Sequence, residues 1–135
     1  MDVLAHFRQA RNAVTMPRGA TVFNEGEQGD NMYVLIQGRA EIKVGDEVVE
    51  SAIPGSLLGE MALVSIGAPR SATVVAATEV KLVPVDVKHF DLLTRESPEF
   101  ARHVMYVMAG RLRYTNERLR VALGESRIRG GRRPR

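Results

Sequence analysis

Residues 55–74 read GSLLGEMALVSIGAPRSATV, an apolar stretch that contains one acid, Glu60, and one base, Arg70. Glycines and a proline lie between the two charges, so small residues and turn formers connect them. Burying a carboxylate and a guanidinium costs free energy unless each charge meets a partner. The pair therefore indicates either a salt bridge that holds a loop on a sheet or a site for a polar ligand.

Short β-branched runs separated by turn residues extend on both sides of this stretch. They read TVF, MYVLIQG, AEIKV, EVVESAI, SATVVAAT and EVKLVPV, with a Gly-Asp hairpin at 45–46. A spacing of about ten residues per strand is typical of antiparallel sandwiches, jelly rolls and small barrels rather than of βαβ folds. We therefore expect an antiparallel β-roll or jelly roll (a double-stranded β-helix) over residues 17–85.

Helices are expected at both ends of this β region. Residues 2–14 place apolar side chains at helical spacing, and Asp2 is suited to cap the first turn. Asp86 is suited to cap a short helix over VKHFDLLTR, and Ser97, followed by proline and glutamate, predicts the start of a helix over residues 98–123. The expected fold class is mainly β with flanking helices, a short N-terminal one and a long C-terminal one.

The C-terminal helix carries a heptad pattern. Its members follow one another at spacings of 4, 3, 4, 3, 4 and 3, as in a two-stranded coiled coil: Ala101, Met105, Met108, Leu112, Thr115, Leu119 and Ala122. Thr115 is polar and Asn116 lies beside it, although leucine would stabilise this seam more. We therefore expect a homodimer through this helix and a partner for the polar pair. The alternative is a helix that packs on its own sheet.

Length and charge predict one domain over residues 1–123, followed by a basic flexible tail over 124–135. The chain has 135 residues and a net charge of +3, but its last nine residues, RIRGGRRPR, hold five arginines. A solvated tail is the ordinary interpretation of such an end, and a nucleic-acid arm is the alternative. The sequence shows neither a membrane span nor a signal peptide, so the expected location is cytoplasmic.

The inventory of reactive residues argues against catalysis and against a metal. The chain has no cysteine, and its three histidines, His6, His89 and His103, all fall on predicted helices. A cupin metal site needs two or three histidines on adjacent strands, and no Ser-His-Asp arrangement can be proposed. We therefore expect no enzymatic activity, no catalytic residues, no metal and no cofactor.

A cyclic sugar phosphate fits the acid and the base of the opening stretch. A carboxylate accepts hydrogen bonds from a ribose hydroxyl, and a guanidinium donates two parallel bonds to phosphate oxygens. Small residues let backbone N–H groups face an anion. On composition alone, this interpretation and the salt bridge remain equally open.

The stretch closely resembles the phosphate-binding cassette of cyclic nucleotide-binding domains. GEMAL at 59–63 and PRSATV at 69–74 match both halves of that cassette and their spacing. Upstream, NEGEQGDNMYVLIQG resembles the glycine-containing turn and following strand of the family. The resemblance extends from about Pro17 to Leu119.

The resemblance implies cyclic AMP as the ligand, with cyclic GMP as the alternative. Glu60 would hold the ribose 2′-hydroxyl, Arg70 the equatorial phosphate oxygens, and Ser71 a further phosphate oxygen. The helix around Thr115 resembles the dimerisation helix of the bacterial cyclic AMP receptor proteins, where a Thr-Ser pair meets the adenine across the dimer. The implied ligand-binding set is Gly59, Glu60, Met61, Ala62, Arg70, Ser71, Ala72, Thr115 and Asn116.

The implied function is a sensor or regulatory domain whose C-terminal helix or dimer geometry changes when cyclic AMP binds. One alternative is the ligand-binding part of a transcription regulator whose DNA-binding domain lies elsewhere, and another is a ligand-free dimerisation module. Asn116 stands where the receptor proteins have serine, and Tyr114 replaces a smaller residue. These departures leave base selectivity open and offer Tyr114 as a stacking surface for the purine.

Overall fold

The computed structural model describes residues 1–130, and the chain divides into two compact units. The first unit is residues 1–101, and the second begins at Arg102. The first unit contains every strand described below, and the second consists, as far as it is described, of the continuation of one helix.

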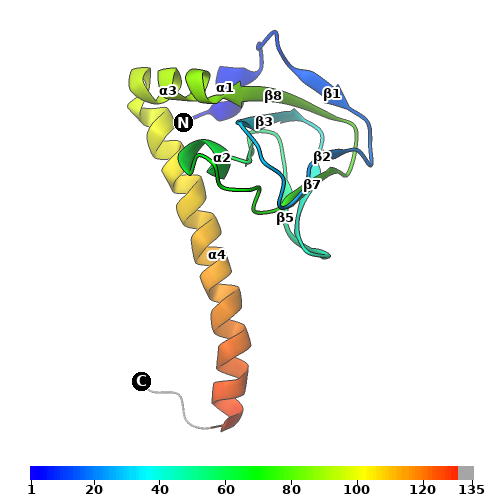
Figure 1. The fold of residues 1–135 in the computed structure, drawn as a ribbon, viewed down its shortest axis with the longest axis vertical. Coiled ribbons are helices and arrows are strands. Elements are labelled where there is room, and N and C mark those ends of the chain that lie inside the picture. Colours follow the sequence, from blue (N-terminus) through cyan, green and yellow to red (C-terminus); the bar gives the residue numbers. More distant parts are fainter. Residues whose placement is uncertain (131–135) are drawn as a thin grey trace. The chain divides into compact units, whose positions relative to one another are not determined.

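Within residues 1–130, eight strands form two four-stranded sheets, which confirms the predicted β-roll (Figure 1). All strand pairs are antiparallel. The first sheet has the order β1 (Val14–Met16), β8 (Val80–Asp86), β3 (Asn31–Gln37) and β6 (Leu57–Leu58). The second has the order β2 (Thr21–Phe23), β7 (Thr73–Ala76), β4 (Ala40–Val44) and β5 (Glu47–Ala52).

The hydrophobic core is built by residues from both sheets. Leu35 of β3, Val74 of β7 and Leu82 of β8 belong to one buried cluster and are almost fully removed from solvent. Side chains alternate along each strand, so β7 buries Val74 and Ala76 while their neighbours remain half-buried. Each buried aliphatic side chain contributes roughly 1.5–3 kcal/mol of hydrophobic free energy. This core fixes β6, after which the cassette begins, and β7, where it ends.

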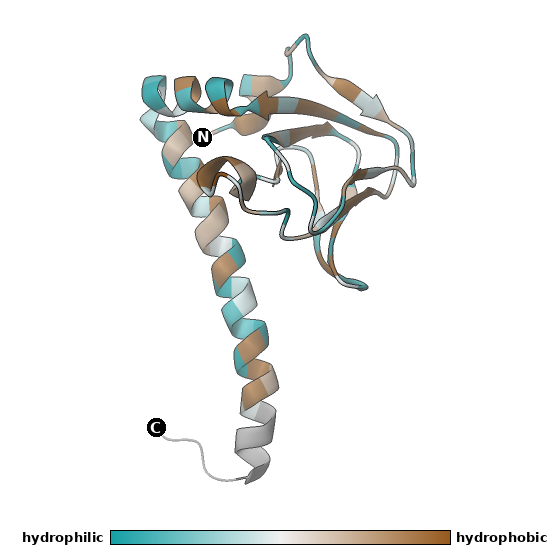
Figure 2. Ribbon diagram, viewed as in Figure 1, coloured by the Kyte–Doolittle hydropathy of each residue, from teal (hydrophilic) through white to brown (hydrophobic). Residues whose placement is uncertain are grey.

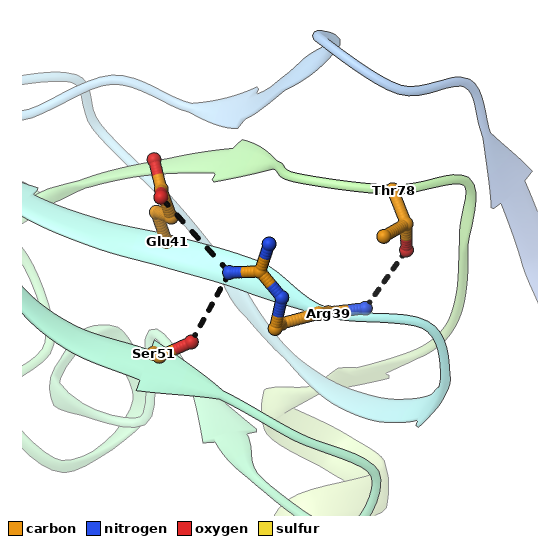
Figure 3. A network of polar contacts seen from close by, with 4 residues as sticks. All are labelled: Arg39, Glu41, Ser51 and Thr78. Atoms are coloured by element: carbon orange, nitrogen blue, oxygen red, sulfur yellow. Dashed lines mark hydrogen bonds and ion pairs between the residues drawn. The ribbon is translucent and has the colours of Figure 1, made fainter.

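Two short connections flank β4: one joins it to β5 within the second sheet, and the other joins it to β3 of the first sheet. The predicted Gly-Asp hairpin at 45–46 is confirmed, because Val44 of β4 pairs with Glu47 of β5 and Gly45 has a φ of 60°. In the β3–β4 turn, the backbone N–H of Arg39 donates to Thr78 Oγ1 at 3.0 Å (Figure 3). Arg39 Nη1 also donates to Ser51 Oγ at 3.4 Å and lies 4.0 Å from a Glu41 carboxylate oxygen (Figure 3). The backbone bond matters more for the turn, since exposed ion pairs contribute little.

Four helices are described: α1 (Val3–Phe7), α2 (Met61–Val64), α3 (Val87–Glu96) and α4 (Pro98–Gly130). The three predicted caps are confirmed. Asp2 Oδ1 accepts from the Ala5 N–H at 3.0 Å, and Asp86 Oδ1 accepts from the His89 N–H at 2.8 Å. Ser97 Oγ accepts from the Phe100 N–H at 3.1 Å at the start of α4. These bonds satisfy N–H groups that the first turns leave without intrahelical partners.

The expected N-terminal helix over 2–14 is wrong in its extent. The helix ends at Phe7, whose buried ring lies 6.2 Å from the ring of Phe100. Val14 instead begins β1 and pairs with Leu82 of β8, so the β region runs from Val14 to Asp86 rather than over 17–85. Strand pairing with β8 therefore overrides the weak helical preference of residues after Phe7.

The expected end of the C-terminal helix at residue 123 is also wrong. The helix begins at Pro98, as predicted, but continues to Gly130. Gly124 costs a helix only about 1 kcal/mol relative to alanine, and the glutamate, serine and arginines that follow are compatible with helix. The remainder of the tail expected over 124–135, residues 131–135, lies outside the described residues.

The pattern along α4 mixes polar and apolar residues. Figure 2 shows hydrophobic and hydrophilic positions interleaved along this helix. Leu112, Leu119, Val121 and Leu123 are each more than half exposed. No helix in the part of the chain that the structure describes has both the length and the apolar character needed to cross a membrane.

Candidate functional site

The cassette connects the two sheets. It leaves the first sheet after β6, passes through Gly59 and the short helix α2, and enters the second sheet at β7. Gly59 has a φ of 78°, a conformation that glycine adopts without strain. The backbone therefore turns sharply at Gly59 and starts α2 directly after Glu60.

Arg70 is the centre of the site. Its side chain is 7% exposed, although it carries a charge. Nη1 donates to the Gly59 carbonyl oxygen at 3.3 Å, and Nη2 donates to Asn31 Oδ1 at 3.1 Å. The guanidinium carbon lies 4.1 Å from the centroid of the Phe23 ring, which is a cation–π distance. These contacts fix the side chain and connect it to β2, β3 and Gly59, which lies two residues before α2.

One nitrogen of the Arg70 guanidinium is left without a hydrogen bond in the described residues. Nε is buried and has no hydrogen-bond partner within the described residues. A buried donor without a partner costs about 1–3 kcal/mol, and more when it is charged. An anionic oxygen is the kind of group that would satisfy it.

Two glycines make room for the guanidinium. A Cβ atom added at Gly29 would lie 2.5 Å from Arg70 Nη2 and closer still to Nε and Cζ. A Cβ atom added at Gly59 would lie 3.1 Å from Phe23 Cε2 and closer to Arg70 Nη1. Neither position tolerates a side chain unless Arg70 moves. Glycine at these two positions therefore leaves room for the Arg70 side chain.

The backbone of Arg70 is held by the turn between β2 and β3. Its N–H donates to the Glu27 carbonyl at 2.7 Å, and its carbonyl accepts from the Gly26 N–H at 2.8 Å. Thr73 Oγ1 accepts from the Glu25 N–H at 2.9 Å. The glycine-containing turn recognised in the sequence thus positions the second half of the cassette.

Burial and nearby charges act on Arg70 in opposite directions. Removal from solvent lowers the pKa of the guanidinium, and this is the largest influence on it. Tyr33, Asp30 and Glu27 raise the pKa through their electrostatic attraction. An arginine remains protonated despite such a shift, because its pKa starts so high. The site therefore presents a positive charge at physiological pH.

Glu60, Met61 and Ala62 lie at the start of α2. Glu60 is only 4% exposed, and its backbone carbonyl accepts from the Leu63 N–H at 3.0 Å. Ala62 is buried, whereas Met61 is 39% exposed. The acid and the base predicted from the sequence are thus both buried in one cassette. The hydrogen bonds of Arg70 go to Gly59 and Asn31 rather than to the Glu60 carboxylate, which weakens the salt-bridge interpretation.

The remaining predicted residues fall into two groups. Ser71 is exposed and Ala72 half-buried, immediately after Arg70 and before β7. Thr115 and Asn116 are exposed on α4, in the second unit. Their contact with a nucleotide base stays a prediction. Tyr114 on the same helix accepts a hydrogen bond from Arg118 Nη1 at 3.3 Å.

Sequence reasoning missed Phe23 and Asn31, which contact Arg70 directly. Phe23 lies far from Arg70 in the sequence, and nothing in its local pattern distinguishes it from other core residues of a strand. Asn31 follows the Gly-Asp turn within the segment that resembles the family. The resemblance therefore included Asn31 but did not predict its hydrogen bond to Arg70. Only the pairing of distant strands brings these side chains together.

Metal chemistry receives no support from the arrangement of possible ligands. His6, His89 and His103 lie on α1, α3 and α4, as predicted. Within residues 1–130, no group of three or more histidine, aspartate or glutamate side chains is placed to hold a metal ion.

A buried glutamate and a buried arginine lie in one connection between the two sheets of this β-roll, an arrangement suited to a polar, anionic ligand. The family model described as the cyclic nucleotide-binding domain matches residues 13–97. The chain therefore belongs to the cyclic nucleotide-binding domain family.

Relatives of known function support this assignment. A CRP-like cAMP-activated global transcriptional regulator of Mycobacterium tuberculosis is 34% identical over 125 residues, which cover 87% of this chain and 54% of the relative. A cyclic nucleotide-gated potassium channel of Rhizobium etli is 44% identical over 89 residues, which cover 66% of this chain and 24% of the channel. The chain thus spans about a quarter to a half of the length of these two relatives.

Solved structures agree with the fold. The catabolite activator protein of Thermus thermophilus matches with a TM-score of 0.72 and 27% identity, over 82% of this chain and 54% of that chain. The structure described as cAMP-bound PfPKA-R matches with a TM-score of 0.64 and 29% identity, over 78% of this chain and 36% of that chain. The chain is therefore related both to bacterial regulators of the catabolite activator type and to regulatory domains of the PKA type.

Proposed function

We propose that this chain is a sensor domain that binds cyclic AMP, with cyclic GMP as the alternative ligand. The observation that carries the proposal is the buried guanidinium of Arg70, which is fixed by protein contacts and retains a buried Nε donor without a partner. A cyclic phosphate offers a singly charged group with oxygens on one side, which suits one oriented guanidinium.

The proposed roles follow the cassette. Arg70 donates to the exocyclic phosphate oxygens, and the Ser71 hydroxyl adds a further donor. Glu60 accepts from the ribose 2′-hydroxyl. Backbone N–H groups at Gly59, Met61, Ser71 and Ala72 complete the phosphate and sugar contacts, Ala62 lies beside them at the start of α2, and Thr115 and Asn116 contact the base. The names of two relatives, a CRP-like cAMP-activated regulator and cAMP-bound PfPKA-R, favour cyclic AMP.

The output that we propose is a change in the geometry of α4, within a homodimer formed through its heptad seam. The seam residues Leu112 and Leu119 are 60% and 56% exposed in the single chain, which favours a helical partner. Binding changes that geometry only if the ligand prefers one arrangement of the helix over the other. A DNA-binding domain elsewhere in a longer protein is compatible with this output. No catalytic role is proposed for any residue.

Calorimetric titration of the purified protein with cyclic AMP and with cyclic GMP tests the proposal. We expect micromolar or tighter binding of cyclic AMP and weaker binding of cyclic GMP. Arg70→Gln should weaken binding of both nucleotides by more than about tenfold, because a charge-assisted hydrogen bond contributes about 1.5–3 kcal/mol. Arg39→Gln is the matched control, since Arg39 is exposed and lies in the turn between β3 and β4. Equal affinity of the Arg70→Gln protein and the unmodified protein would refute the site assignment.

Analysis of the nucleotide after incubation separates a sensor from an enzyme or a scaffold. We expect cyclic AMP to be recovered intact by ion-exchange chromatography. Recovery of 5′-AMP would show turnover and contradict the proposal, and a protein that binds neither nucleotide would be a ligand-free dimerisation module.

A further inference from the structure

Phe23 provides an aromatic surface for Arg70. It is the last residue of β2, 8% exposed, with its ring 4.1 Å from the guanidinium carbon. The ring of Tyr33 on β3 stacks against Phe23 at a centroid distance of 6.3 Å and an interplanar angle of 23°. Any large apolar side chain could fill this part of the core, but only an aromatic ring attracts a cation through its face. The choice of phenylalanine therefore concerns the arginine as well as the packing.

Asn31 binds one edge of the Arg70 guanidinium. It is the first residue of β3, where pairing with Asp86 of β8 fixes its backbone, and its Oδ1 accepts from Arg70 Nη2. An amide oxygen holds the guanidinium without cancelling its charge. An aspartate here would form a stronger bond, but it would compete with an incoming anion for the same group. The neutral acceptor thus orders the arginine without adding a further negative charge beside it.

We call the three groups that hold the Arg70 guanidinium the Arg70 clamp: Phe23, Asn31 and the carbonyl of Gly59. Arginine has many rotamers, so ordering its side chain only at the moment of binding would reduce affinity. The clamp orders the side chain during folding and leaves the buried Nε without a partner in the described residues. Anion binding then meets a donor that is already in place.

We propose that Phe23 and Asn31 are positioning residues that order the Arg70 guanidinium before the anionic ligand arrives, through contacts that place no carboxylate directly on it. The assignment of that ligand as a cyclic nucleotide rests on the proposed function, whereas the ordering of Arg70 does not.

Nuclear magnetic resonance of the ligand-free protein, labelled with ¹⁵N, tests the ordering directly. The Nε–Hε resonance of Arg70, assigned as the signal lost in Arg70→Gln, should be displaced by the Phe23 ring and exchange slowly with solvent. Phe23→Leu should return it to the range of exposed arginines, and Phe23→Tyr should preserve it. Phe90→Leu is the matched control, because Phe90 is also 8% exposed but packs on Phe100, at a centroid distance of 6.0 Å, in a separate part of the core.

Calorimetry with cyclic AMP tests the consequence for binding. Phe23→Leu should weaken binding about tenfold, while Phe23→Tyr and Phe90→Leu should stay within about twofold of the unmodified protein. Asn31→Asp should retain the slowly exchanging resonance yet weaken binding about tenfold, because order is kept and charge is offset. If Asn31 only stabilised the fold, Asn31→Asp would change the exchange of the Arg70 Nε–H and the affinity for cyclic AMP together. Should Phe23→Leu fail to fold, Asn31→Asp and Asn31→Ala still test the clamp.

The outcomes distinguish the two proposals. A rapidly exchanging Arg70 Nε–H in the unmodified protein, or a Phe23→Leu protein that binds as tightly as the unmodified one, would overturn the clamp while leaving the sensor intact. A slowly exchanging Nε–H that Phe23→Leu abolishes, in a protein that binds neither cyclic nucleotide, would overturn the proposed function and support the clamp.

Discussion

Gly29→Ala tests the placement of Arg70 with the smallest possible change. Gly29 does not have a positive φ, so alanine is compatible with its backbone conformation. The added methyl group would lie 2.5 Å from Arg70 Nη2 and closer to Nε and Cζ, well inside van der Waals contact. The guanidinium must therefore leave its position, and it loses the bonds to Asn31 and Gly59 when it does.

The magnitude follows from the bonds at stake. A displaced guanidinium can no longer meet the phosphate in the bound geometry, and one lost charge-assisted hydrogen bond costs about 1.5–3 kcal/mol. The expected result is a roughly 10- to 100-fold increase in the Kd for cyclic AMP. The free energy of unfolding should change by less than about 1 kcal/mol, because Arg70 gains solvation when it moves out and alanine reduces the entropy of the unfolded chain.

Gly26→Ala is the control that separates affinity from stability. Gly26 lies in the same turn with a φ of 89°, and a Cβ atom there would meet nothing within 4 Å. Backbone strain should lower its free energy of unfolding by roughly 1–2 kcal/mol, while cyclic AMP binds as before. For each of the two variants, calorimetry gives the Kd for cyclic AMP and urea denaturation gives the free energy of unfolding. If Gly29→Ala binds cyclic AMP as tightly as the unmodified protein, the fixed position of Arg70 is irrelevant to recognition.

Four further changes test other parts of the structure. Thr115→Val should weaken cyclic AMP binding roughly 2- to 10-fold by removing one neutral hydrogen bond, with unchanged thermal stability; unchanged affinity by calorimetry would remove Thr115 from the site. Leu119→Glu should yield monomers in sedimentation velocity while Arg113→Glu, outside the heptad seam, should not; a Leu119→Glu dimer would exclude that seam. Ser97→Ala should lower the free energy of unfolding by about 1 kcal/mol in urea, because the first turn of α4 loses its cap; an equally stable protein would show that the cap contributes nothing. Gly38→Ala should cost more than about 2 kcal/mol in the same assay, since its φ is 91° and a Cβ would lie 2.8 Å from Thr78 Oγ1 and closer to the Glu79 carbonyl; a smaller loss would mean that the β3–β4 turn adapts.

The fold was largely predictable because its signals are local. The strands around Ile42 and Val83 appear as β-branched runs between turn residues, and the caps at Asp86 and Ser97 are set by side chains within three residues of their partners. The strand β1 was missed for the converse reason. Val14 continues a helical spacing in the sequence, and only the distant pairing with Leu82 makes it a strand.

The site shows the same division between local and distant information. The cassette residues Glu60 and Arg70 were found because a motif places them at a fixed spacing in one stretch of chain. Phe23 and Asn31 were not found, since their relation to Arg70 exists only after β2 pairs with β7 and β3 pairs with β8. Recognition of a motif therefore identified the groups that would touch a ligand, but not the groups that orient them.

An ordered Arg70 also limits where a conformational response can arise. A ligand shifts an equilibrium only to the extent that it binds one state more tightly than the other. If the clamp holds the guanidinium in the same place with and without ligand, its contact with the phosphate contributes equally to both states and supplies affinity without a signal. The difference between states must then come from contacts other than that of Arg70, and among the predicted ones the base contacts of Thr115 and Asn116 are those made by α4 itself. Nucleotides that share the cyclic phosphate but differ in the base should accordingly differ more in their effect on α4 than in their contact with Arg70.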